Sequence, residues 1–200
     1  PHIVVINTTK TLLLAILVML KLVLMKAKLS TKEIKEVAEK LNQLDPGFLP
    51  IDIFWAIARL VTTPTANFTG FRRHNNKLQV LLVRRDKNDK YWPNAWHVPG
   101  SVMMSTDKEH GFDSTYSRVI SSEMEDKFTI LSGPMYVYFN FWDTPRGREL
   151  TFENIIHIEP KDDNYPGEFF DVNNLQEDTI ELQKQSIRKL ASHINDNFLI

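Results

Sequence analysis

Two stretches decide the fold of this chain: residues 91–100 read YWPNAWHVPG, and residues 118–125 read RVISSEME. A helix that begins near Asp113, a good N-cap residue, places apolar side chains on one stripe at four-residue spacing, as expected of a helix that packs on a sheet. This stripe consists of Tyr116, Ile120 and Met124. Positions 118 and 122 form one row on such a helix and positions 119 and 123 another, so carboxylates there would converge on a common ion. Glu123 is the one carboxylate at these four positions.

The two stretches together resemble the Nudix box. The family pattern runs Gly, five residues, Glu, seven residues, then Arg-Glu-hydrophobic-any-Glu-Glu-any-Gly-hydrophobic, and it commonly follows a Trp-x-x-Pro-Gly turn like residues 96–100. The matching residues of the helix are Arg118, Ile120 and Glu123. The departures are Val119 and Ser122 in place of two glutamates, and Glu125 in place of the glycine. The box is therefore degenerate.

The resemblance implies an α+β fold, a Nudix-like α/β/α sandwich with a mixed β-sheet, over roughly residues 67–194. It also implies a Mg²⁺-dependent hydrolase, with Mn²⁺ as an alternative ion, that cleaves a pyrophosphate bond in a nucleoside diphosphate-linked or related small molecule. The alternative hypothesis is a Nudix-like nucleotide-binding or regulatory module that kept the pocket and lost the chemistry. The missing carboxylates favour the module, whereas Arg118 and Glu123 favour the hydrolase. We expect the hydrolase.

Candidate metal ligands follow from the resemblance. Glu123 is expected to bind the ion with help from Glu125 or Glu109, because Mg²⁺ is often held by one or two carboxylates plus substrate phosphates. Gly100 and Arg118 lie about four positions farther apart than in the family, so the glutamate of the turn has no secure counterpart. Glu109 is its nearest candidate, with Asp107 behind it, and solvated loop charges are the alternative interpretation of both residues.

Catalytic and substrate-binding candidates lie around the same turn. Arg118 is expected to orient the glutamates by a charge-assisted hydrogen bond. Glu168 is a candidate general base, since some Nudix proteins use a glutamate from a late loop. The candidate substrate contacts are Trp96, His97 and Gly100. For Trp96, as for Trp92, burial beside the turn is the alternative to stacking on a base, and for His97 the alternative is a packing role.

The composition limits other functions. The 24 Lys and Arg residues balance 25 Asp and Glu residues, giving a net charge of −1, so no nucleic-acid partner is expected. The chain contains no cysteine, which excludes disulfides and agrees with a cytoplasmic location. Neither a Ser-His-Asp order nor a glycine-rich phosphate loop occurs.

The first residues form a separate hydrophobic segment, residues 1–24. Residues 11–25 read TLLLAILVMLKLVLM, which is shorter than the roughly twenty residues that span a bilayer. Three interpretations remain: a membrane anchor built from residues 3–25, a helix packed on the domain, or residues upstream of the native start at Met25. We favour the last.

The remaining chain predicts a helical arm over residues 25–65, a candidate dimer arm or lid, and a Nudix-like domain over residues 66–200. The arm contains a capping box at Ser30 and Glu33 and a second helix over about residues 51–61. Two hairpins are expected, one from residues 66–72 and 78–85 and the other from residues 133–143 and 149–159. Aromatic residues 136, 138 and 139 are expected in the core. A last helix is expected over about residues 179–195.

Overall fold

The computed structural model describes residues 29–107 and 112–194, and it divides the chain into two compact units, Pro1–Asp45 and Pro46–Ile200. In the first unit, helix α2 spans Thr31–Leu41 and begins with the predicted capping box. The Ser30 backbone N–H donates to the Glu33 carboxylate at 2.7 Å, and the Glu33 backbone N–H donates to Ser30 Oγ at 3.3 Å. Residues 1–24, for which a membrane anchor was one of three interpretations, and Glu109, a candidate metal ligand, lie outside the described residues. Within the described ranges, no helix is both long and apolar enough to cross a membrane.

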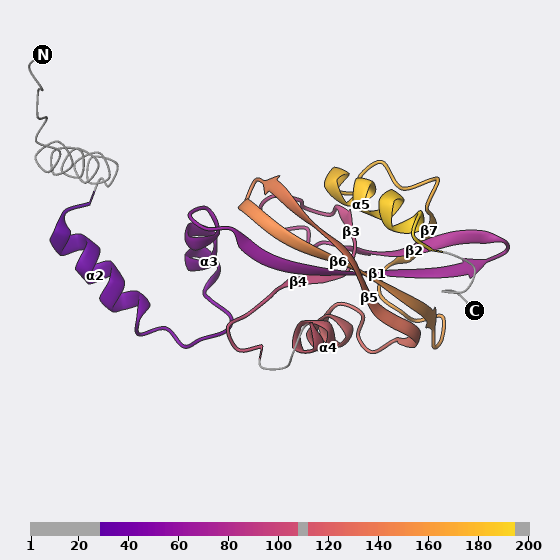
Figure 1. Cartoon of the computed structure of the whole chain (residues 1–200), viewed down its shortest axis with the longest axis horizontal. Helices are drawn as coiled ribbons and strands as arrows, with labels where there is room; N and C mark the ends of the chain where they lie inside the picture. Colours follow the sequence, from indigo (N-terminus) through magenta and orange to yellow (C-terminus); the bar gives the residue numbers. More distant parts are fainter. Residues whose placement is uncertain (1–28, 108–111, 195–200) are drawn as a thin grey trace, which may run out of the picture. The chain divides into compact units, whose positions relative to one another are not determined.

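A mixed β-sheet forms the centre of the second unit (Figure 1). The strands in the described residues are β1 Thr63–His74, β2 Lys77–Arg84, β3 Trp96–His97, β4 Gly100–Val102, β5 Phe128–Thr144, β6 Gly147–Pro160 and β7 Glu168–Asp171. Their order is β3-β2-β1-β6-β5, with β4 also paired to β1 and β7 to β2. The pair β1 and β6 is parallel, whereas the other pairs are antiparallel.

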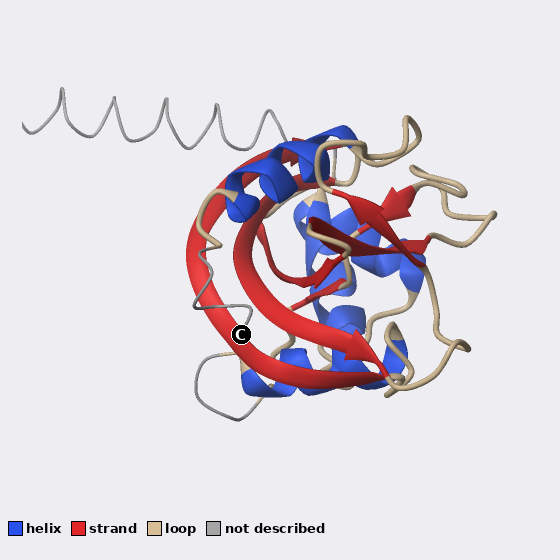
Figure 2. Cartoon of the chain, turned by 90° about the vertical axis from the view of Figure 1, so that its right-hand side faces the viewer, coloured by secondary structure: helices blue, strands red, loops and turns tan. Residues whose placement is uncertain are grey.

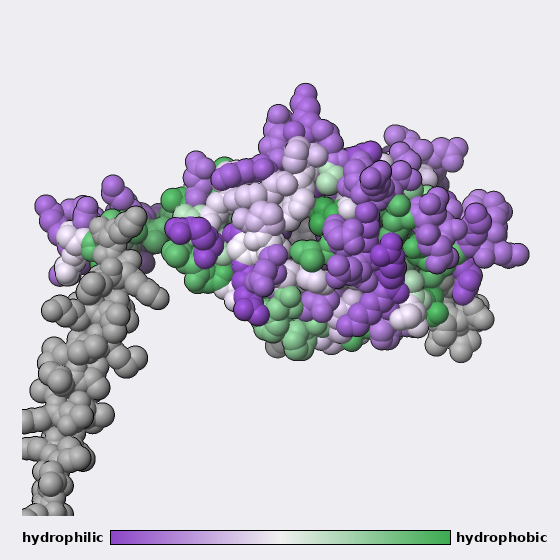
Figure 3. Space-filling model, turned by 90° about the horizontal axis from the view of Figure 1, so that it is seen from above, coloured by the Kyte–Doolittle hydropathy of each residue, from purple (hydrophilic) through white to green (hydrophobic). Residues whose placement is uncertain are grey.

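Helices cover both faces of this sheet (Figure 1). Because side chains alternate along a strand, Leu82 contributes to the apolar cluster that contains Ile187 of helix α5, Glu181–Ala191. The adjacent Leu81 contributes to the opposite cluster, with Val119 of helix α4, Asp113–Ser122. This arrangement confirms the predicted α/β/α sandwich. The surface above α5 is largely hydrophilic (Figure 3), as expected for the outer face of an amphipathic helix.

The strands β5 and β6 form a long hairpin that curves strongly (Figure 2). Register shifts interrupt their pairing, and such bulges bend a strand. The prediction that the β5 aromatics are core residues was wrong for Tyr136 and Phe139, which are 46% and 52% exposed. The reason is that β5 is an edge strand with one face open to solvent.

Helix α3, Ile51–Ala58, belongs to the same compact unit as the sheet. Strand β1 begins at Thr63, so residues 63–65, which the sequence suggested as the end of the helical arm, are part of the sheet. The turn of the β5–β6 hairpin approaches α3 closely. A methyl group added at Gly147 would lie 2.2 Å from the carbonyl oxygen of Ala58.

We expect Gly147→Ala to lower the free energy of unfolding by more than about 2 kcal/mol, because the added methyl meets rigid backbone. The backbone of Gly147 also has a φ of +137°, which side chains disfavour. Urea denaturation measures the change. Gly47→Ala is the matched control, since Gly47 has a φ of +122° but its nearest contact would be Thr106 at 3.6 Å. Equal losses in the two variants would contradict the close approach.

Candidate functional site

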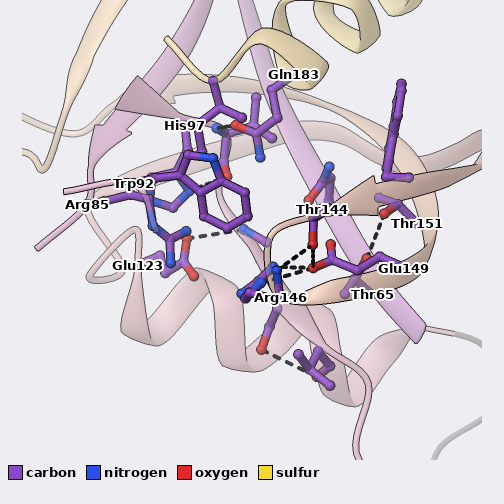
Figure 4. A pocket seen from close by; sticks show the side chains of 17 residues that line it. Thr65, Arg85, Trp92, His97, Glu123, Thr144, Arg146, Glu149, Thr151 and Gln183 are labelled. Carbon is purple, nitrogen blue, oxygen red and sulfur yellow. Dashed lines mark hydrogen bonds and ion pairs between the residues drawn. The ribbon is translucent and has the colours of Figure 1, made fainter. Parts of the chain in front are cut away.

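A cavity of about 230 Å³ lies where β1, β4 and β6 meet the end of α4, the residue 85–99 segment and α5 (Figure 4). Its lining is mainly polar. The side chains important for its chemistry are Arg85, Trp92, His97, Glu123, Arg146 and Gln183.

Glu123 is the C-cap of α4, where its backbone N–H still donates to Val119. Its carboxylate accepts a hydrogen bond from the backbone N–H of Gly100 at 3.1 Å, so the helix end and the Pro-Gly turn meet at the cavity. Position 100 favours glycine, because a Cβ there would lie 2.9 Å from the backbone carbonyl oxygen of Ala66 as well as 2.4 Å from Asn67 Oδ1. Burial raises the pKa of Glu123 to about 7, although the Gly100 hydrogen bond and the charge of Arg85 act in the opposite direction.

This pKa predicts that Glu123 makes folding pH-dependent. Because the folded-state pKa lies above the ordinary value of 4.5, the folded protein binds more protons than the unfolded chain between about pH 4.5 and 7. The contribution of protonated Glu123 to the free energy of unfolding is complete below that pH window and is lost as the pH rises through it. Between these pH values we expect the free energy of unfolding to fall by up to about 3 kcal/mol less in Glu123→Gln than in the wild type. Urea denaturation of both proteins at several pH values measures the difference, and parallel curves would contradict it.

Two guanidinium groups face the cavity (Figure 4), and a carboxylate fixes each of them. Arg85 Nε and Nη2 donate to Asp89 at 2.8 and 2.6 Å. Arg146 Nε donates to Glu149 Oε1 at 3.0 Å, and its Nη2 lies 2.7 Å from the same oxygen. Both guanidinium groups lie near the indole of Trp92, at 5.6 and 5.1 Å from its ring centre. These contacts use Nε and Nη2 of each guanidinium, which leaves Nη1 outside them as a donor for a ligand.

His97 and Gln183 are joined through the backbone of Val98. His97 Nδ1 lies 2.8 Å from the Val98 carbonyl oxygen, and the Val98 N–H donates to Gln183 Oε1 at 2.9 Å. Burial, with the charge of Arg85 acting in the same direction, lowers the pKa of His97 to about 3. The imidazole is therefore neutral at physiological pH.

Arg118 lies outside this cavity. Its guanidinium pairs with Asp107 and donates to the carbonyl of Val102 at 2.8 Å. Burial acts to raise the pKa of Asp107, but hydrogen bonds from Met104, Arg118 and Thr115 outweigh it and the pKa is lowered. Arg118 thus anchors the loop that follows β4, rather than orienting Glu123 as expected.

Three other sequence candidates also lie away from the cavity. Trp96 is buried in the core against Phe170, with ring centres 5.0 Å apart, so packing rather than ligand contact explains it. Glu168 is an exposed residue at the start of β7. Glu125 is exposed in a turn with a φ of +50°. The candidates that the structure brings together at the cavity are His97, Gly100 and Glu123.

The described residues do not supply the carboxylate set that the resemblance implies for Mg²⁺. Val119 is fully buried in the core, and Ser122 is exposed with its hydroxyl donating to the Arg118 carbonyl at 2.6 Å. Glu149 is already paired with Arg146. Among residues 29–107 and 112–194, no three His, Asp or Glu side chains lie together where they could hold a metal ion. The described residues therefore supply fewer carboxylates than the family pattern, and water and ligand oxygens would have to complete the six-oxygen shell of Mg²⁺.

Sequence reasoning missed Arg85, Arg146 and Gln183. The first two stood in short basic or turn segments, and their nearby partners Asp89 and Glu149 carried no sign in the sequence of facing a cavity. Gln183 carried no signal, because one polar residue in a helix has many possible neighbours.

Comparison with known proteins supports the fold. No protein-family model and no curated protein sequence matches the chain. A crystal structure of an Ap4A hydrolase from C. elegans matches with a TM-score of 0.52 and 13% identity, covering 68% of this chain and 100% of that one. A binary complex of a C. elegans Ap4A hydrolase matches with a TM-score of 0.50 and 13% identity, covering 66% and 97%. The chain has a Nudix-like fold.

Proposed function

We propose that this chain is a Nudix-fold module that binds a nucleotide-like ligand through its phosphate groups without Mg²⁺-dependent hydrolysis. The observation that supports the proposal is the pair Arg85 and Arg146, held toward one cavity by Asp89 and Glu149. Hydrogen bonds from a guanidinium to an anionic oxygen are charge-assisted, and a fixed guanidinium loses less entropy on binding than a free one. The cavity therefore presents donors that suit phosphate oxygens.

The size and the lining of the cavity limit which ligands it can bind. Pockets for small molecules usually measure about 300 to 1,000 Å³, so a cavity of about 230 Å³ suits one part of a ligand while the rest stays at the mouth. Trp92 adds an aromatic wall to the arginines. A nucleoside diphosphate combines a planar ring with an anionic group and is the appropriate probe. The similar C. elegans protein is an Ap4A hydrolase, which supports the same choice.

The test is calorimetric titration of the full chain with ADP and with inorganic pyrophosphate, in EDTA and again in Mg²⁺. Binding in EDTA, with intact ADP recovered by chromatography after incubation in Mg²⁺, is the expected result. Failure of both ligands to bind would overturn the binding proposal. Release of phosphate in Mg²⁺ would show that the chain is an enzyme.

A second candidate function, cleavage of a pyrophosphate bond, is favoured by the position of Glu123. Its carboxylate lies in the cavity beside Gly100, at the position matched to the last glutamate of the family pattern. If phosphate release is found, Glu123→Gln is expected to slow turnover by roughly a hundredfold. Unchanged turnover in that variant would remove Glu123 from the reaction.

A further inference from the structure

We infer that His97 and Gln183 read the edge of a heterocyclic ring that carries a hydrogen-bond donor next to an acceptor, such as the amino edge of adenine. The inference rests on the proposed function and adds which kind of ring the same cavity selects. Both side chains line the cavity, and each is held by one hydrogen bond to Val98.

The first half of the pair is an acceptor. A backbone carbonyl can only accept, so His97 Nδ1 must carry the proton that it shares with Val98 at 2.8 Å. The neutral ring then has a lone pair at Nε2. His97 is 8% exposed and lines the cavity, and its hydrogen bond to Val98 uses Nδ1. A ligand group in the cavity that donates a hydrogen bond could use this lone pair.

The second half of the pair is a donor. The Val98 N–H can only donate, so the oxygen of the Gln183 amide must face it, as the 2.9 Å contact shows. This hydrogen bond also fixes the amide orientation, which distances alone do not. The Gln183 NH₂ group is then left for the cavity, and Figure 4 shows this side chain reaching in from α5. Val98 thus sets one acceptor and one donor in the same wall.

This pair complements a ring edge with the opposite order of groups. The exocyclic amine of adenine would donate to His97 Nε2, while an adjacent ring nitrogen would accept from Gln183. A site that hydrogen-bonds a ligand group rejects the analogue that lacks it, because its own polar group is left unpaired. Arg85 and Arg146 remain available for the phosphates.

The test compares ADP with purine riboside 5′-diphosphate, which lacks the amine, and with inorganic pyrophosphate. We expect the wild-type chain to bind ADP at least about tenfold more tightly than the analogue. Gln183→Glu keeps an oxygen for the Val98 N–H but replaces the donor by an acceptor, so it should weaken ADP binding at least about tenfold. Gln185→Glu, the same change at an exposed position of α5, is the control for charge and should bind ADP like the wild type.

The outcomes separate the two proposals. Equal affinity of the wild type for ADP and the analogue, or unchanged ADP affinity in Gln183→Glu, would overturn the recognition pair while phosphate binding stands. Absence of binding by ADP and pyrophosphate would overturn the proposed function itself. A thermal melt of each variant confirms that it is folded before its affinity is compared.

Discussion

Val119→Glu, which restores one of the missing family carboxylates, is expected to lower the free energy of unfolding by about 4 kcal/mol or more. Val119 is fully buried in the cluster that contains Phe68, Leu81 and Ile156. An isolated carboxylate there would lose its hydration without gaining a partner, which is among the largest penalties of a single substitution. Urea denaturation at pH 7 and above measures the loss.

Ser122→Glu is the matched control, because it adds the same side chain three positions along the same helix. Ser122 is exposed, so its stability should change by no more than about 0.5 kcal/mol. Its Mg²⁺ affinity should equal that of the wild type, since the side chain does not line the cavity. Tighter Mg²⁺ binding by Ser122→Glu would show that position 122 faces a metal site, and a stable Val119→Glu protein would show that position 119 is not enclosed in the core.

The fold was largely predictable because periodicity and turn chemistry act locally. The strand predicted over residues 66–72 is the centre of β1, Thr63–His74, and the one predicted over 149–159 lies within β6, Gly147–Pro160. Helix α4 begins at Asp113, near the expected position, although its N-cap is Phe112 and not Asp113, and Met124 of the predicted stripe is fully buried. Alternation of side chains in strands and their three- to four-residue spacing in helices can be recognised in the sequence without knowledge of long-range contacts.

The site was less predictable because long-range pairing decides it. Arg85, Arg146 and Gln183 are far apart in the sequence, and the sheet brings them to one cavity. Trp96 was a candidate substrate contact because the sequence did not reveal the short strand β3, which decides where its side chain points. In β3, Trp96 and His97 are consecutive and therefore point to opposite faces. His97 consequently lines the cavity, and Trp96 packs against Phe170.

Loss of the Arg146 guanidinium should have the largest effect on ligand affinity. In Arg146→Gln we expect the dissociation constant for pyrophosphate in EDTA to rise by about tenfold to a hundredfold, the cost of losing a charged hydrogen bond. Arg146→Lys should recover only part of the affinity, because an ammonium group cannot keep both the contact with Glu149 and a second donor in the planar geometry of arginine.

Arg148→Gln is the control for the loss of one positive charge two positions away. Arg148 has a 58% exposed side chain, pairs with Asp143 at 3.9 Å and does not line the cavity. Its removal should change pyrophosphate affinity less than twofold, as expected for a screened surface charge. Arg146→Gln also leaves the buried Glu149 without its cation, so a thermal melt must accompany the titration. If folded Arg146→Gln binds pyrophosphate as tightly as Arg148→Gln does, the phosphates lie elsewhere and the cavity is not the anion site.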